Sequence, residues 1–442
     1  MSVSAMEDEY TKLVRRMNPP GVLIDNDACE DATIIRVDSE NKHGNILEIV
    51  QLLTDLNFIV KKGYMTSDGG WFMNVFYVTD REGKKITDTR IIRHLHNSIV
   101  TGSCFLPTLV DSVGVRPSKE HTFIELTGTD RPGLLSEVCA VLTDLKCSIV
   151  NAEFWTHNTR AAAVVCITDK ATGCAIDDPH RLSTIKEIIC KVLGVNSDLT
   201  SAKMMTSVGV THTERRLHQM LHADRDYDHV GNNKTLRPQV CLLDCLEKNY
   251  TVVMLSSRDR PKLLFDTLCT LTDMQYEVFH GVVHNSGIEA YQEYYIRHVG
   301  GRWKMSEAER QCVTQCLEAA IERRATEGLE LELRTKDREG LLLDITRTFR
   351  ENGVCIRRAE MSIDNGMAID NFHVTDMLGN PVEAKEVESL CAQICKTSLQ
   401  VRKNPTVLSL KPPKETITSF LQRNCFQSIM SHTWYLLKRL RF

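Results

Sequence analysis

The chain has 442 residues, of which 25% are charged and 42% hydrophobic, as is ordinary for a folded globular protein of about three domains. Its formal net charge of −4 gives no electrostatic reason to expect nucleic-acid binding, which normally uses clustered Lys and Arg. The 16 cysteines are scattered behind an acidic start, "MSVSAMEDEY", that has no export or import signal, and no apolar run is long enough to span a membrane. We therefore expect reduced thiols in the cytosol or nucleus.

Four related stretches recur along the chain, each after a β-prone run. They read "DSENKHGNILEI" from Asp38, "TGTDRPGLLSEV" from Thr127, "SSRDRPKLLFDT" from Ser256 and "RTKDREGLLLDI" from Arg334. A helical pattern, two further β-prone runs and a second helical segment follow each copy. In the second copy the first helix begins near Leu134, and Asp178 or Ser183 is available to cap the second.

A fourth strand would complete each β-α-β-β-α unit as a ferredoxin-like split βαβ fold. We expect it at 112–115 in the first copy, 203–208 in the second and from Leu399 in the last. The third copy has no such run after its long helix (306–324), so its edge strand is expected upstream, at 239–246.

The predicted fold class is α+β, with four ferredoxin-like (βαββαβ) domains in tandem. The expected segments are an N-terminal segment (1–30), domains at 33–115, 122–208, 250–327 and 329–406, a linker with a charged helix (209–249) and a basic tail (412–442). One unit of about 75 residues buries a modest core and leaves sheet edges open, so we expect the sheets to pair side by side. The linker divides the chain into two halves of two repeats, which is the natural partition for such pairs.

The strand, T-x-D-R-P-G-L-L loop and helix, followed by an x-V-x-x-A-E strand, resemble the ACT domain, a small-molecule sensing module of amino-acid metabolism. Four copies, with "GTDRPGLLSEV", "NAEFWTHNTRAAAVV" and "AYQEYYIRH" in this order, resemble the plant ACT-domain-repeat (ACR) proteins from about Asp25 to Thr406. The resemblance implies a regulatory protein that binds amino acids. It also implies that the ligand lies at the loop before the first helix, where a neighbouring second strand adds a polar side chain.

The loops themselves suit a zwitterion, which needs an acceptor for its ammonium group and donors for its carboxylate. The first turn of a helix offers unpaired N–H groups and a partial positive charge, and a glycine allows close approach. The candidate ligand-binding residues are Asn41 and Gly44 in the first copy, Asp130, Arg131, Gly133 and Leu134 in the second, Asp259 and Lys262 in the third, and Asp337, Arg338, Gly340 and Leu341 in the fourth. A nucleotide phosphate loop is excluded because Leu134 and Leu135 stand where Lys and Ser or Thr are required.

The corresponding second-strand positions are Lys62, Asn151, His280 and Arg358. Asn151 is the best suited of these, since an amide can donate and accept at once, and Arg358 is the candidate in the fourth copy. The third copy is expected to be empty or altered, because Lys262 replaces the glycine and would either block the site or contact a ligand carboxylate.

A purely structural explanation of the loops remains open. Asp before Arg-Pro is an ordinary helix cap, and the glycine would then only permit a tight turn. Two functional alternatives to an amino-acid sensor are a ligand-free interaction scaffold and an unrecognised enzyme. We expect a non-catalytic protein with no cofactor and no metal, because neither a nucleophile motif nor a dinucleotide glycine pattern stands out.

Other groups of residues are assigned structural roles. His218 and His222 lack the Glu of a zinc protease and are expected on a solvated linker helix. The i, i+4 cysteine pairs and the tryptophans Trp71 and Trp155 are expected to pack within helices and sheets. In the tail, Phe426, Met430, Trp434 and Leu437 share one face of a basic helix, which would contact a membrane surface, a partner protein or the repeats themselves. The expected partners are a free amino acid and an unidentified protein, with no nucleic acid.

Overall fold

The computed structural model describes residues 21–40, 44–68, 71–100, 121–193, 203–207, 212–228, 238–245, 249–302, 304–325, 328–382, 386, 390 and 399–402. The chain divides into two compact units, Met1–Arg402 and Lys403–Phe442, and all described residues belong to the first. The predicted tail helix, the strand expected at 112–115 and the pair Cys391 and Cys395 lie outside the described residues. No helix of the described part is long and apolar enough to cross a membrane.

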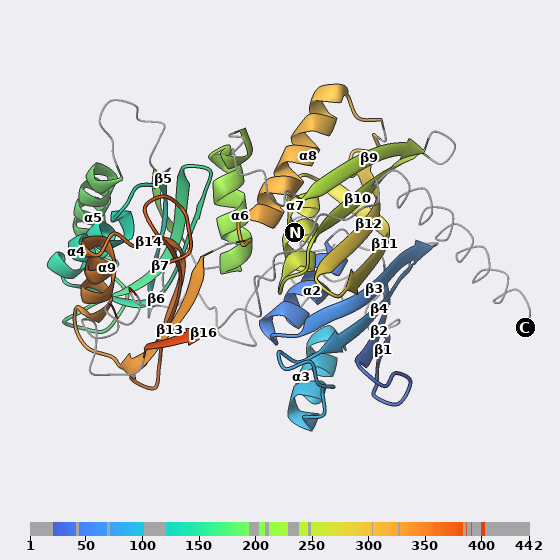
Figure 1. The fold of residues 1–442 in the computed structure, drawn as a ribbon, viewed down its shortest axis with the longest axis horizontal. Helices are drawn as coiled ribbons and strands as arrows, with labels where there is room; N and C mark the ends of the chain where they lie inside the picture. The colour runs from blue at the N-terminus through green and yellow to red at the C-terminus, as the bar shows by residue number, and fades with distance from the viewer. Residues whose placement is uncertain are drawn as a thin grey trace, which may run out of the picture. The chain divides into compact units, whose positions relative to one another are not determined.

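The first sheet has the strand order β1-β2-β4-β3-β11-β12-β10-β9 (Figure 1). Its strands are β1 (Gly21–Asp25), β2 (Thr33–Glu40), β3 (Ile59–Asp68), β4 (Trp71–Thr79), β9 (Gln239–Cys245), β10 (Tyr250–Arg258), β11 (Tyr276–Ser286) and β12 (Glu289–His298). The helices of the same repeats are α2 (Asn45–Asp55), α3 (Thr89–Val100), α7 (Leu263–Asp273) and α8 (Glu307–Glu322).

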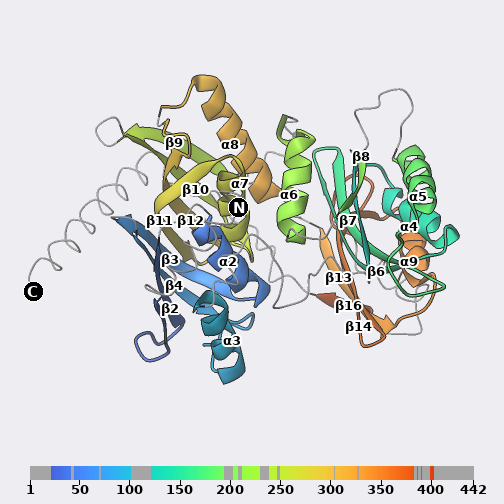
Figure 2. The ribbon, with the colours of Figure 1, turned by 180° about the vertical axis from the view of Figure 1, so that it is seen from behind.

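The second sheet has the order β16-β13-β15-β14-β6-β7-β5-β8, seen from behind in Figure 2. Its strands are β5 (Thr122–Thr129), β6 (Cys147–His157), β7 (Arg160–Asp169), β8 (Lys203–Ser207), β13 (Leu329–Lys336), β14 (Cys355–Asp364), β15 (Met367–Thr375) and β16 (Leu399–Arg402). The accompanying helices are α4 (Leu134–Asp144), α5 (Pro179–Val192) and α9 (Leu341–Glu351). The predicted α+β fold of ferredoxin-like units, with sheets paired side by side, is confirmed.

The pairing alternates along the chain. Strand β3 of the first repeat joins β11 of the third, and β6 of the second joins β14 of the fourth, each pair antiparallel. The expectation that each half of the chain pairs within itself is therefore wrong. The reason lies in the cores: one apolar cluster is shared by α2 and α7, and another by α4 and α9. Helix packing thus accompanies the choice of partner.

The edge strands followed the sequence prediction in three repeats. Strand β8 pairs with β5, β16 with β13, and β9 reaches the third repeat from upstream to pair with β10. In the first repeat β1 pairs with β2, a strand that the sequence had not indicated. The cap predicted for the second helix of the second repeat is also confirmed, since Asp178 accepts from the amides of His180 and Arg181.

Helix α6 (Thr213–Ala223) does not lie on a solvated surface as predicted, and this is the largest local error. Leu217, Met220 and Leu221 of α6 are buried against Trp155 and Ala162 on the second sheet. Its polar side faces α7 of the first sheet, where Arg215 bonds Asp273 at 2.6 Å. His218 is 2% exposed and His222 is half-buried in the same junction. The helix pattern was misleading because its charged residues are paired rather than solvated.

The cysteines of the described residues are free thiols. Cys316 is buried in α8, with its Sγ 3.9 Å from that of Cys312, while Cys241 and Cys245 are half-buried in β9. The tryptophans differ: Trp155 is fully buried in the sheet junction as expected, but Trp71 is 42% exposed.

Candidate functional site

The residue before each of the helices α2, α4, α7 and α9 adopts a left-handed backbone. Gly44, Gly133, Lys262 and Gly340 have φ angles of 88°, 83°, 65° and 72°, and none of these N-caps makes a side-chain cap bond. The N-cap is therefore this residue and not the preceding Asp, whereas the tight turn that the structural explanation assigns to the glycine is confirmed. The glycines are required because only glycine enters this region without a steric cost, and Lys262 accepts about 1–2 kcal/mol of strain to do so.

The basic residue of each described loop is bound within its own repeat. Arg131 pairs with Glu137, Arg260 with Asp266 and Arg338 with Asp344, each six residues further along. Two of these guanidinium groups also donate to the end of the repeat's second helix: Arg131 to Val192 O at 2.9 Å and Arg260 to Ile321 O at 2.8 Å. The acidic partners were missed, although an acid stands six residues after the base in every copy, including Glu48 after Lys42.

The loop of the second repeat faces the fourth repeat. Arg357 of β14 donates from Nη1 to Asp130 Oδ2 at 3.3 Å. Arg350 of α9 lies over Gly133, because a Cβ built on that glycine would stand 2.5 Å from Arg350 Cδ. Burial raises the pKa of Asp130, against the lowering effect of Arg357. One carboxylate, two guanidinium groups and the start of α4 thus meet between two repeats.

The second-strand residues chosen from sequence lie elsewhere. Arg358 points to Glu360 and stacks 5.7 Å from the Trp155 ring, and the exposed Asn151 stands opposite Ser362 across the β6–β14 junction. A bulge between Ile356 and Arg358 shifts the register of β14, which leaves Arg357 to reach the loop. In the first sheet His280 bonds Thr66 at 2.9 Å across β3 and β11, whereas Lys61, the residue before Lys62, interacts electrostatically with Asp259.

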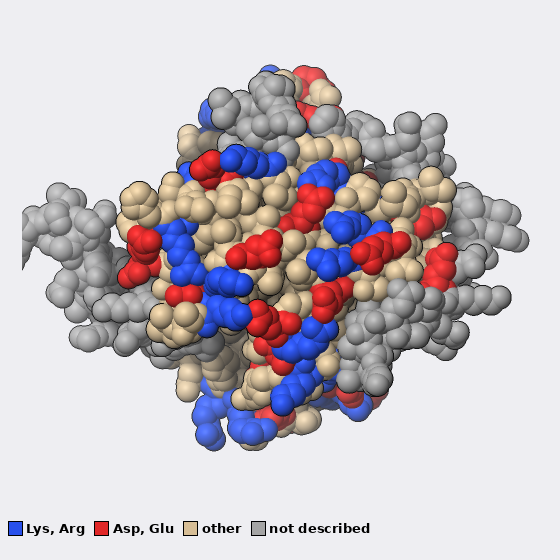
Figure 3. Space-filling model, turned by 90° about the vertical axis from the view of Figure 1, so that its left-hand side faces the viewer, with Lys and Arg blue, Asp and Glu red and all other residues tan. Residues whose placement is uncertain are grey.

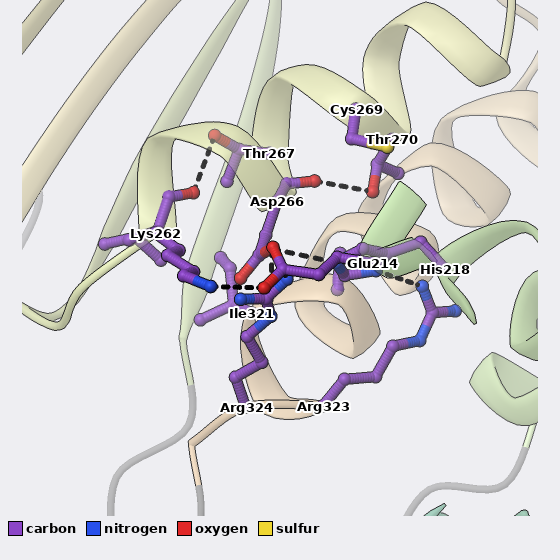
Figure 4. Close-up of polar contacts among 12 residues, drawn as sticks. Glu214, His218, Lys262, Asp266, Thr267, Cys269, Thr270, Ile321, Arg323 and Arg324 are labelled. Carbon is purple, nitrogen blue, oxygen red and sulfur yellow. Dashed lines mark hydrogen bonds and ion pairs between the residues drawn. The ribbon is translucent and has the colours of Figure 1, made fainter. Parts of the chain in front are cut away.

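The loop of the third repeat is covered. Asp259 accepts from Asn285 Nδ2 at 2.9 Å, and burial raises its pKa. Lys262 forms an ion pair with Glu214 of α6, as Figure 4 shows. The side chain that replaces the loop glycine is therefore engaged by the chain itself.

The glycines before α2 and α9 are less enclosed. A Cβ built on Gly44 or Gly340 would meet nothing within 4 Å. Beside the fourth loop, burial and the neighbouring Asp337 raise the pKa of Asp370 to about 7. Leu134 and Leu341 are buried, so their side chains support the helix start, and Asn41 lies outside the described residues.

Comparisons with known proteins agree with this architecture. The model of the ACR family N-terminal ACT domain matches residues 28–106, and an ACT domain model matches residues 120–171. ACT domain-containing protein ACR6 of Arabidopsis thaliana is 58% identical over 430 residues, which cover 95% of this chain and 99% of that protein. ACT domain-containing protein ACR4 of the same plant is 53% identical and covers 96% of both chains. The chain belongs to the ACR family.

As a member of the ACR family it is an ACT-domain regulatory protein. Figure 3 shows the face of this ACR protein that carries the helices α4, α5 and α9, where Lys and Arg lie interspersed with Asp and Glu. Ion pairs such as Lys191–Glu187 on α5 account for this pattern. Among the described residues in this view, the two charge signs alternate over short distances.

A matched pair of substitutions tests the packing of the two glycine loops. Gly340→Ala meets no neighbour and is expected to cost only the left-handed strain, about 1 kcal/mol, while Gly133→Ala also pushes the flexible Arg350 side chain aside and should cost slightly more. Urea unfolding of both variants provides the measurement. Equal losses would mean that the Arg350 side chain moves aside without cost, and a smaller loss in Gly133→Ala would contradict its contact with Arg350.

Proposed function

We propose that this ACR protein is a non-catalytic amino-acid sensor whose ligand binds at the loop of the second repeat. The observation that carries the proposal is the Asp130–Arg357 ion pair, which joins the second and fourth repeats beside Gly133. Its side chains are 17% and 33% exposed, so solvent reaches the pair. An amino acid entering there can exchange one ion pair for two: its ammonium group with Asp130 and its carboxylate with Arg357.

Further hydrogen-bond donors lie near the position proposed for the ligand carboxylate. Arg350 lies over Gly133, at the N-terminus of α4, where a helix carries a partial positive charge. Charge-assisted hydrogen bonds of this kind are stronger than neutral ones. The raised pKa of Asp130 means that burial destabilises its ionised form. The ammonium group of a bound ligand would stabilise that form.

A ligand in this position contacts two repeats and therefore stabilises their paired arrangement. By linkage, the ligand lowers the population of states in which the second and fourth repeats are arranged differently. The surface available to a protein partner in the cytosol or nucleus would change accordingly. An interaction scaffold without a ligand is the competing function. It would keep Asp130 and Arg357 as a structural pair only.

Calorimetric titration of the full chain with each of the twenty amino acids tests the proposal. We expect at least one to bind, and Asp130→Asn or Arg357→Gln to weaken that binding by about tenfold or more, since each removes about 1.4 kcal/mol or more of charged hydrogen bonding. Asp259→Asn is the matched control, because it occupies the same position in the covered third loop.

Two results would contradict the sensor. Absence of heat with all twenty amino acids favours the scaffold. An equal loss of affinity in Asp130→Asn and Asp259→Asn would place the ligand outside the second loop, even though the protein binds it.

A further inference from the structure

Helix α6 places one carboxylate in the loop of the third repeat. Glu214 is 6% exposed, and its Oε2 accepts from Arg324 Nη2 at 2.6 Å. Its other oxygen pairs with Lys262 at the start of α7 (Figure 4). Burial alone would raise the pKa of Glu214, but Arg324 and Lys262 hold it well below its ordinary value. The carboxylate is therefore ionised and bound by two cations next to a helix N-terminus.

A carboxylate bound by cations beside a helix N-terminus is also the arrangement proposed for a free amino acid at the second loop. In the second repeat the glycine before α4 leaves room for Arg350 of another repeat to lie over the helix start, with Arg357 beside Asp130. In the third repeat Lys262 stands in the glycine's place, and the anion comes from residue 214 of the same chain. Lys262 adopts the strained left-handed backbone that glycine would adopt without strain. This strain is consistent with a role for its ammonium group in binding Glu214.

The same carboxylate also reaches the other sheet. Carboxylate oxygens of Glu153 on β6, Glu214 and Glu360 on β14 all lie within 4.8 Å of one another. Arg324 stacks 4.5 Å above the Trp155 ring, on β6 as well. Three carboxylates could suggest a metal site, but Lys262 and Arg324 already pair with Glu214, and Arg358 pairs with Glu360. Glu214 is thus the residue at which α6 joins the third loop to the β6–β14 junction.

We propose that α6 is an internal ligand: Glu214 fills the anion position of the third loop, closes that loop to free amino acids and holds α6 as a releasable strap between the two sheets. The proposal does not depend on whether another loop binds an amino acid. It requires only that the third loop recognises a carboxylate and that α6 loosens when this carboxylate is removed.

Chemical rescue of the full-length chain tests it. Glu214→Ala should leave a carboxylate-sized space beside Lys262 and Arg324, and the backbone amides of α6 should exchange hydrogen about tenfold faster than in the unaltered protein. Sodium acetate should restore the protection, whereas sodium chloride at the same ionic strength should not. In Glu214→Gln the side chain still fills the space, so acetate should have no effect there.

Two further variants keep the test decisive. Glu187→Ala removes an exposed glutamate of α5 and should leave α6 exchange unchanged. If Glu214→Ala does not fold, Lys262→Gly removes the ammonium group while relieving backbone strain, and it should speed α6 exchange while the protein remains folded. Unchanged α6 exchange in the folded Glu214 and Lys262 variants, or loosening that acetate does not reverse in Glu214→Ala, would overturn the proposal.

Discussion

Arg323→Met should lower the free energy of unfolding by about 3–5 kcal/mol, the range measured when one partner of a buried ion pair is removed. Asp226 is fully buried, and Arg323 donates to its two oxygens from Nε at 2.8 Å and from Nη2 at 2.7 Å. The carboxylate would keep His157, at 2.8 Å, and would lose its strongest donor. Urea unfolding at pH 7 measures the loss.

His218 adds to this effect. Burial lowers its pKa to about 4, against the opposing effect of Asp266, so the ring is neutral at pH 7. Arg323 Nη1 donates to Nδ1 at 2.9 Å, which leaves Nε2 to donate to Asp266 at 2.8 Å. Without Arg323 the ring also loses the bond that fixes this tautomer.

The control is Arg90→Met, which breaks an exposed pair with Asp88 and should lower the free energy of unfolding far less, because solvent screens exposed ion pairs. Replacing both buried partners, in Arg323→Met with Asp226→Leu, should recover part of the stability because no unpaired charge remains. If Arg323→Met lowers the free energy of unfolding as little as Arg90→Met does, the ion pairs around α6 are not buried as described above.

Much of this architecture was accessible from the sequence because local patterns determine it. The recurring loop, the amphipathic spacing after Leu134 and the runs at 203–208 and 239–246 are all local signals, and they located helices and edge strands correctly. The loop glycines were also found, although their cause is a positive φ rather than ligand access alone.

What the sequence did not reveal depends on contacts between distant residues. The alternating pairing follows from which helix faces fit together, as between α4 and α9, and no single repeat encodes it. Arg357 was passed over for Arg358 because a bulge in β14 changes which side chain reaches the loop. His218 and Glu214 looked solvated because their partners, Asp266 and Arg324, are about 50 and 110 residues away in the chain.

Glu153→Gln should stabilise the protein above pH 7 and have progressively less effect as the pH falls toward 4.5. Burial raises the pKa of Glu153 to about 7, with Glu214 and Glu360 adding repulsion and Arg358 and Arg324 opposing it. Between pH 4.5 and 7 the folded chain keeps a proton that the unfolded chain has released, so stability falls as the pH rises. At about 1.4 kcal/mol per pKa unit, the full penalty above pH 7 reaches up to about 3 kcal/mol.

Glutamine reproduces the protonated state, because its Oε1 can still accept the bond that Trp155 Nε1 donates to Glu153 at 2.9 Å. The stability difference between variant and unaltered protein, from urea unfolding at pH 5 and pH 8, should therefore be several times larger at pH 8. Glu187→Gln on the exposed face of α5 should show the same small difference at both values. A Glu153→Gln effect that does not change with pH would mean that this carboxyl is ionised across the whole range, and that the cations around α6 outweigh its burial.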